Sequence, residues 1–159
     1  MLMTRKIVVV LLLAVTAVWA GQNKSSVSDS CDAYLGVSVP KYRIAQTFVN
    51  RDAKFTSLTV SIAPTDTNRE KVVALACKLG RDYSREQVLV VWILDNHRAA
   101  KQFRFAGQYS SEATRTALRA SYSFDREKNS QELTWTPDRD KPFSTIKIKL
   151  GAPPPIASN

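Results

Sequence analysis

The sequence predicts an α+β fold: a small mixed β-sheet of about five or six strands with one βαβ unit, a C-terminal antiparallel hairpin region and one main helix packed on a face. Several short segments alternate apolar and polar side chains, which is the period of a strand with one buried face. One longer segment repeats apolar residues at helical spacing. It lies between two predicted strands, and this order predicts a right-handed crossover with parallel pairing.

Two strands are expected before the helix. Residues 41–49 alternate bulky side chains with smaller or charged ones. Residues 55–62 do the same, with aliphatic side chains on one face and Thr59 and Ser61 on the other. Pro64 follows and cannot donate a backbone hydrogen bond to a neighbouring strand, so we expect the second strand to end before it.

The main helix is predicted at residues 68–79. Thr67 and Glu70 have the spacing of a capping box, in which the hydroxyl and the carboxylate each satisfy a backbone N–H at the start of a helix. Apolar residues then recur along one helical face. Gly80 follows at the position where a left-handed residue commonly ends a helix, so we expect the helix to stop before it.

A buried strand is expected directly after the helix. Residues 88–94 form a continuous apolar run rich in β-branched side chains, which predicts a strand buried on both faces. Asp95 follows and is expected to cap a short helix at residues 96–103. Residues 107–112 are expected to form a loop.

The C-terminal part predicts further strands. Residues 118–124 and 132–135 alternate apolar and polar side chains on either side of the polar segment 125–130. This pattern predicts a hairpin with a long, charged turn. Residues 146–150 alternate Ile and Leu with Lys and form the last expected strand.

The amino-terminal segment predicts a secretory signal peptide at residues 1–20. Arg5 and Lys6 precede an uncharged apolar run, and Ala20 ends the segment before the expected cleavage point. The run covers about twelve residues, whereas a membrane-spanning helix needs roughly 20, so an uncleaved anchor is the weaker alternative. We expect a secreted or periplasmic protein without stable membrane insertion after cleavage. The remainder should comprise a flexible leader, a single domain and a disordered Pro-rich tail at residues 21–32, 33–150 and 151–159.

The sequence contains two cysteines, Cys31 and Cys77. Exported proteins meet oxidising surroundings, where two cysteines predict one disulfide. By loop-closure entropy this bond would stabilise the fold by at most about 4 kcal/mol. A catalytic thiol or a metal pair is the alternative. No Cys-x-x-Cys spacing is present and the single His is too few for an ordinary zinc site, so we expect no metal ligand and no cofactor.

The chain is basic, with a formal net charge of +9 at pH 7, which permits acidic partners without requiring them. Lys147 and Lys149 lie on the polar face of one predicted strand, Arg119 lies on that of another, and Arg115 precedes it. These cations form a candidate basic surface, with an ordinary solvated face as the alternative. No exposed aromatic ladder accompanies them, so the stacking platform of single-strand nucleic-acid binders is missing. We therefore expect no nucleic-acid partner.

A candidate ligand site lies at the edge where the strands of the βαβ unit end, because open sheets bind ligands there. Asp66 follows the first of these strands, and Asp95, His97 and Arg98 follow the second, so we expect these residues to lie near one another. A carboxylate-oriented His can act as a general base, and an Arg can hold an anion. Alternatively, the two carboxylates only cap helix starts.

No motif in the sequence identifies a reaction. A Gly-rich phosphate loop, a Gly-x-Ser-x-Gly elbow and a His-Glu-x-x-His zinc motif are all absent, which weighs against an enzyme. We expect an exported binding or accessory domain that acts through a surface, either the basic surface or an unprotected edge strand, on an unknown protein partner. The alternatives are a small hydrolase-like enzyme with its site at the Asp95/His97 edge, and a binder of anionic envelope components.

Overall fold

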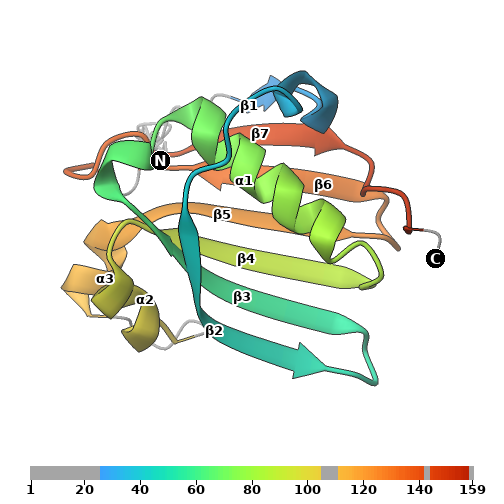
Figure 1. Ribbon diagram of the computed structural model, residues 1–159, viewed down its shortest axis with the longest axis horizontal. Helices are drawn as coiled ribbons and strands as arrows, with labels where there is room; N and C mark the ends of the chain where they lie inside the picture. The colour runs from blue at the N-terminus through green and yellow to red at the C-terminus, as the bar shows by residue number, and fades with distance from the viewer. Residues whose placement is uncertain (1–25, 105–110, 142–143, 158–159) are drawn as a thin grey trace, which may run out of the picture.

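The computed structural model describes residues 26–104, 111–141 and 144–157. The predicted signal peptide at residues 1–20 lies outside these residues, as does most of the loop expected at residues 107–112. Within the described ranges, a seven-stranded mixed sheet carries helices on both faces (Figure 1). None of the described helices is long and apolar enough to cross a membrane.

The strands are β1 (Ser26–Ser28), β2 (Tyr42–Asn50), β3 (Phe55–Ile62), β4 (Val88–Leu94), β5 (Leu118–Asp125), β6 (Ser130–Trp135) and β7 (Ile146–Gly151). The helices are α1 (Arg69–Asp82), α2 (His97–Gln102) and α3 (Glu112–Ala117), with short 3-10 helices η1 (Cys31–Tyr34) and η2 (Pro64–Asp66). The order in the sheet is β1-β7-β6-β5-β4-β3-β2. β1 pairs with β7 and β3 with β4 in parallel, and the other neighbours are antiparallel.

The mixed α+β class is confirmed, but the strand count differs from the prediction. The sheet has seven strands rather than five or six, because β1 adds a second parallel pair at one edge. β1 is only three residues long, Ser26–Ser28, which is too short to show an alternating pattern in the sequence. The described part of the expected leader at residues 21–32 therefore contains a strand and the start of η1.

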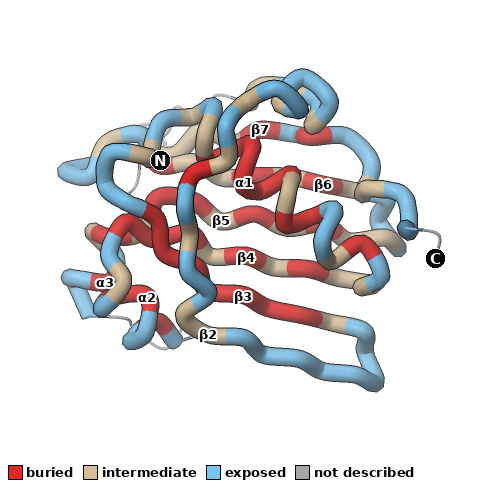
Figure 2. The backbone as a smooth tube through the Cα atoms, in the orientation of Figure 1, coloured by how far each residue is buried: buried red, intermediate tan, exposed pale blue. Residues whose placement is uncertain are grey.

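The main core lies between α1 and one face of the sheet. Along each strand, residues that face α1 alternate with residues that face away, as strand geometry requires. The largest fully buried side chains of this core include Tyr122, Phe124, Leu58, Leu75 and Leu79. Figure 2 shows the buried residues gathered on α1 and on β3, β4 and β5, while β2 is largely exposed along the lower edge of the sheet.

α1 begins differently from the predicted helix. The side chain of Asn68 accepts a hydrogen bond from the backbone N–H of Lys71 at 3.0 Å and so caps the helix. The hydroxyl of Thr67 instead donates to the carbonyl of Pro64 at 3.1 Å. The predicted capping box of Thr67 and Glu70 is therefore wrong, because an Asn one position later satisfies the same kind of backbone donor.

α1 also continues beyond Leu79, the predicted last residue, and ends at Asp82. Gly80 lies within the helix and is buried. A Cβ atom at Gly80 would collide with the hydroxyl of Tyr122 on β5. Glycine at this position therefore allows the helix to approach the sheet closely, and it does not end the helix.

A second, smaller core lies on the opposite face of the sheet, where β3 and β4 end. Trp92 and Leu94 alternate along β4 with the residues that face α1, and they pack against Phe103 and the alanines of α2. The ring centroids of Trp92 and Phe103 are 5.1 Å apart. This packing holds α2 next to β2 and β3 (Figure 1).

The segments at both ends of the described chain are attached to the sheet and helix core. The predicted Cys31–Cys77 disulfide is present and joins η1 to α1, with Cα atoms 5.5 Å apart. At the other end, a guanidinium nitrogen of Arg126 donates to the carbonyl of Pro154 at 2.8 Å. The Pro-rich segment expected as a disordered tail at residues 151–159 therefore makes a defined contact within its described part.

Candidate functional site

The residues predicted at the βαβ edge take part in separate contacts. Asp66 forms an ion pair with Lys71 at 2.6 Å. Asp95 and His97 bond to residues of different strands, and Arg98 is exposed. Within the described ranges, no hydrogen bond or ion pair joins any two of the four predicted edge residues. The structure does not connect them as one catalytic group.

Asp95 is the centre of a buried ion-pair cluster. Its Oδ2 atom lies 3.1 Å from Nε of Arg119 and 2.7 Å from a guanidinium nitrogen of Arg139. The side chains of Asp95 and Arg119 are only 4% and 3% exposed, so this pair is enclosed by protein. The α2 cap predicted for Asp95 is supplied by Asn96, whose side chain accepts from the backbone N–H of Ala99. The cluster therefore joins β4, β5 and the segment between β6 and β7.

The cations predicted to form a basic surface are also dispersed. Arg119 is buried, and burial lowers its pKa against the opposing effect of the neighbouring Asp95 carboxylate. Arg115 is exposed on α3. Lys147 and Lys149 lie on β7, where Lys147 pairs with a glutamate of β6 at 2.8 Å. Arg119 cannot contribute to an exposed surface, because its charge is enclosed beside Asp95.

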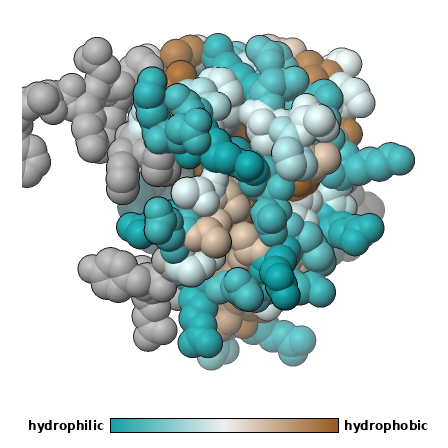
Figure 3. Space-filling model, turned by 90° about the vertical axis from the view of Figure 1, so that its left-hand side faces the viewer, coloured by the Kyte–Doolittle hydropathy of each residue, from teal (hydrophilic) through white to brown (hydrophobic). Residues whose placement is uncertain are grey.

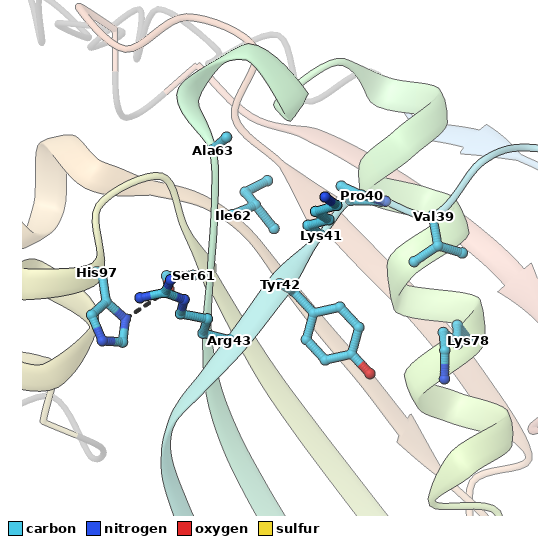
Figure 4. Close-up of a pocket in the computed structure, with 10 residues that line it drawn as sticks. All are labelled: Val39, Pro40, Lys41, Tyr42, Arg43, Ser61, Ile62, Ala63, Lys78 and His97. Carbon is cyan, nitrogen blue, oxygen red and sulfur yellow. Dashed lines mark hydrogen bonds between the residues drawn. The ribbon is translucent and has the colours of Figure 1, made fainter.

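A pocket at the start of β2 was not predicted from the sequence, because its lining comes from several distant segments. The pocket has a volume of about 710 Å³ and is open to solvent. It is lined by Val39, Pro40, Lys41, Tyr42, Arg43, Ser61, Ile62, Ala63, Lys78 and His97 (Figure 4). Tyr42 points to the α1 side of β2, whereas Arg43 extends toward Ser61 and His97. Of the four predicted edge residues, His97 lines this pocket.

Ser61 and His97 form a polar pair in this pocket. Ser61 Oγ and His97 Nδ1 lie 2.9 Å apart and share a hydrogen bond. Ser61 is on β3 and 5% exposed, while His97 is the first residue of α2. From the sequence, Ser61 looks like any polar residue on the outer face of a strand. Only the packing of α2 against β3 shows that it meets His97.

A β-bulge shapes β2 next to the pocket. The register with β3 shifts between Ile44 and Gln46, and such shifts re-aim the side chains on either side. Beyond the bulge, the amide nitrogen of Gln46 lies 2.8 Å from the carbonyl oxygens of Ala100 and Phe103 and 2.9 Å from that of Lys101. Gln46 thereby satisfies carbonyl groups at the end of α2 and attaches α2 to β2.

β2 presents an exposed apolar edge. Among the described residues it pairs only with β3, on one side. Ile44 and Val49 are 45% and 50% exposed, which is unusual for large aliphatic side chains in a strand. The end of the molecule seen in Figure 3 shows mainly hydrophilic side chains, with weakly apolar ones at its centre and more hydrophobic ones along the top. Among the described strands, the exposed large hydrophobic side chains all lie on β2: Ile44, Phe48 and Val49.

Comparisons of the chain with protein-family models, curated proteins and solved structures found no match. Its function must therefore be argued from the pocket and from the neighbouring edge of β2.

Proposed function

We propose that this chain is an exported binding module that receives an extended segment of a partner protein along the free edge of β2. The observation that carries the proposal is the nine-residue strand β2, which forms the edge of the sheet and exposes Ile44 and Val49. An edge strand offers a row of backbone N–H and C=O groups to another chain. Addition of a strand from a partner is a recurrent form of peptide recognition.

The part of β2 best suited to pairing is residues 46–50. Proteins commonly protect a sheet edge with charged residues, Pro or a bulge. β2 has these features at its start, where Pro40, Lys41 and Arg43 precede the bulge. From Gln46 onward the strand follows β3 in unbroken register and carries no charged side chain before its end at Asn50.

The edge is also held in place before any partner arrives. Gln46 bonds to the end of α2, and the alanines of α2 and the following Phe103 are buried in the second core. A strand that is already ordered loses little conformational freedom when it binds. The attachment to α2 therefore favours binding at β2.

The proposal predicts that β2 contacts the partner directly. Val49 is replaced by the photo-crosslinking residue benzoylphenylalanine, and the full chain is exposed to its native envelope fraction and culture medium before illumination. We expect the benzoylphenylalanine at position 49 to crosslink to a defined segment of one protein, because an added strand lies against this edge. The complex should also protect the backbone amides of residues 46–50 from hydrogen exchange.

The matched control carries the same crosslinker at Glu127, which is exposed in the turn between β5 and β6. Equal crosslinking from Glu127 and Val49, or a complex without amide protection along β2, would show that β2 is not the binding edge.

The Ser61–His97 pair favours a second candidate function, hydrolysis of an ester. A hydroxyl bonded to an imidazole beside a pocket resembles an activated nucleophile. Ser61 Oγ would attack the ester carbonyl, His97 Nδ1 would take its proton and return it to the leaving alcohol, and water would then release the acid. No described residue bonds to the other ring nitrogen of His97, so the ring lacks the third, orienting group of a triad. This is why binding is the preferred function.

The hydrolase candidate predicts turnover that depends on both residues. With p-nitrophenyl acetate as substrate, Ser61→Ala and His97→Gln should each lower the rate at least about 100-fold, which is the usual contribution of general-base catalysis. Ser123→Ala, at the other end of the sheet face, should leave the rate unchanged. If all four proteins release nitrophenol at the rate of buffer alone, this candidate is excluded for such esters.

A further inference from the structure

The pocket at the start of β2 is lined by more cations than the described carboxylates neutralise. Lys41, Arg43 and Lys78 line it together with His97, and the described lining contains no Asp or Glu. Lys78 is paired with Asp82 on α1, and this pairing raises the pKa of Lys78. Within the described part of the chain, Lys41 and Arg43 have no ion-pair partner. The pocket therefore favours an anionic group.

The rest of the lining is apolar. Val39, Pro40, Ile62 and Ala63 supply aliphatic surface, and the ring of Tyr42 points toward α1 (Figure 4). Binding sites commonly combine an apolar lining with a few polar groups that orient the ligand. The matching ligand group has a negative charge on a short aliphatic stem, as the side chain of Glu does.

The pocket is continuous with the edge of β2. Lys41 directly precedes β2, and Tyr42 and Arg43 are its first residues. A partner segment paired along residues 46–50 would reach the pocket after about four further residues, at about 3.3 Å for each. A single extended segment of about nine residues can therefore lie on the edge and fill the pocket.

We infer that the pocket binds an acidic side chain of the partner segment, so that the module selects extended peptides with Glu or Asp over Lys41 and Arg43. The inference rests on the proposed function of β2 and adds its specificity. An anionic envelope polymer could also be attracted to these cations, but it would make no use of the adjoining edge. The continuity of pocket and edge favours an acidic peptide.

The experiment uses labelled decapeptides of alternating Val and Thr that carry two Glu residues at the amino end or the carboxyl end. Matched peptides carry Gln instead, and all are titrated against the full chain with its disulfide intact. We expect one Glu peptide to bind about tenfold more tightly than its Gln counterpart, because hydrogen bonds to ionised groups are the stronger ones. The end that requires Glu will show the direction of pairing.

Two double variants test whether the preference for Glu peptides depends on the cations of the pocket. Lys41→Gln combined with Arg43→Gln should remove the preference, so that the Glu and Gln peptides bind this variant with equal affinity. Lys147→Gln combined with Lys149→Gln removes the same charge from β7, near the opposite edge of the sheet, and should keep the preference. None of these four side chains is buried, and circular dichroism will show whether each variant is folded.

The two proposals fail in different ways. Equal affinity for the Glu and Gln peptides, with amide protection along β2, would overturn the acidic preference and leave the edge function intact. Absence of binding by every peptide at millimolar concentration would overturn both. Equal weakening by the β2 and β7 variants, with affinity that falls steeply in salt and no amide protection, would identify a general polyanion binder instead.

Discussion

Replacement of Asp95 by Asn should lower the free energy of unfolding by about 3 kcal/mol, because removal of one partner leaves a buried charge without compensation. The charge left behind is that of Arg119, whose side chain is 3% exposed and cannot turn into solvent without opening the packing between β4 and β5. Asn has nearly the same shape as Asp, so the substitution tests the charge and creates no cavity. Urea denaturation followed by circular dichroism will measure the difference.

The matched control is the third member of the cluster, Arg139. Its side chain is 55% exposed, so Arg139→Gln should cost less than about 1 kcal/mol, as exposed ion pairs do. Combining Asp95→Asn with Arg119→Met should recover part of the stability, because the second substitution removes the buried charge that the first leaves without a partner. The buried-charge explanation is wrong if Arg139→Gln costs as much as Asp95→Asn, or if the double variant is less stable than either single one.

Removal of the disulfide should lower the free energy of unfolding by about 2–4 kcal/mol. The bond joins Cys31 to Cys77 across a sequence separation of 46 residues, and a closed loop restricts the unfolded chain. It also holds η1 against α1, beside the main core. The variant with Cys31→Ser and Cys77→Ser should therefore unfold at a lower denaturant concentration than the oxidised chain.

Reducing agent provides the control for this prediction. It should shift the midpoint of the native chain to that of the serine variant and leave the variant itself unchanged. A native chain whose midpoint is the same with and without reducing agent would show that the bond contributes no stability.

The secondary structure could be predicted where local patterns are strong. The alternating segments became β2, β3, β5, β6 and β7, and the continuous apolar run became β4. β1 was missed because three residues carry no period. α3 was missed because it is a short helix that begins within the segment expected as a loop. These short elements form through their contacts with the rest of the domain.

Gly80 illustrates why helix ends were harder to predict than helices. In the sequence it stands where a glycine commonly ends a helix. In the structure the reason for glycine lies on another strand, because Tyr122 occupies the space where a side chain would project. No local pattern can report a contact with a residue so distant in the sequence.

The candidate site was predictable only in part. His97 was singled out from its place after β4, and it does lie in the pocket beside β2. Asp95 was placed with it, but the buried Arg119 pairs with Asp95 and draws it into the structural cluster. Ser61, Lys41 and Arg43 were not predicted as site residues, because each resembles an ordinary polar residue at a strand or its start.

The sequence by itself determined the α+β class, the order of the main strands and helix, and the disulfide, because these follow from local periodicity and from cysteine number. Tertiary structure alone decided that β2 is an exposed edge, that a pocket lined by Lys41 and Arg43 lies at its start, and that Asp95 is buried while His97 meets Ser61. Periodicity specifies which face of a strand is apolar. It does not specify which strands become neighbours, and the neighbours determine which charges are buried and which remain free to bind a partner.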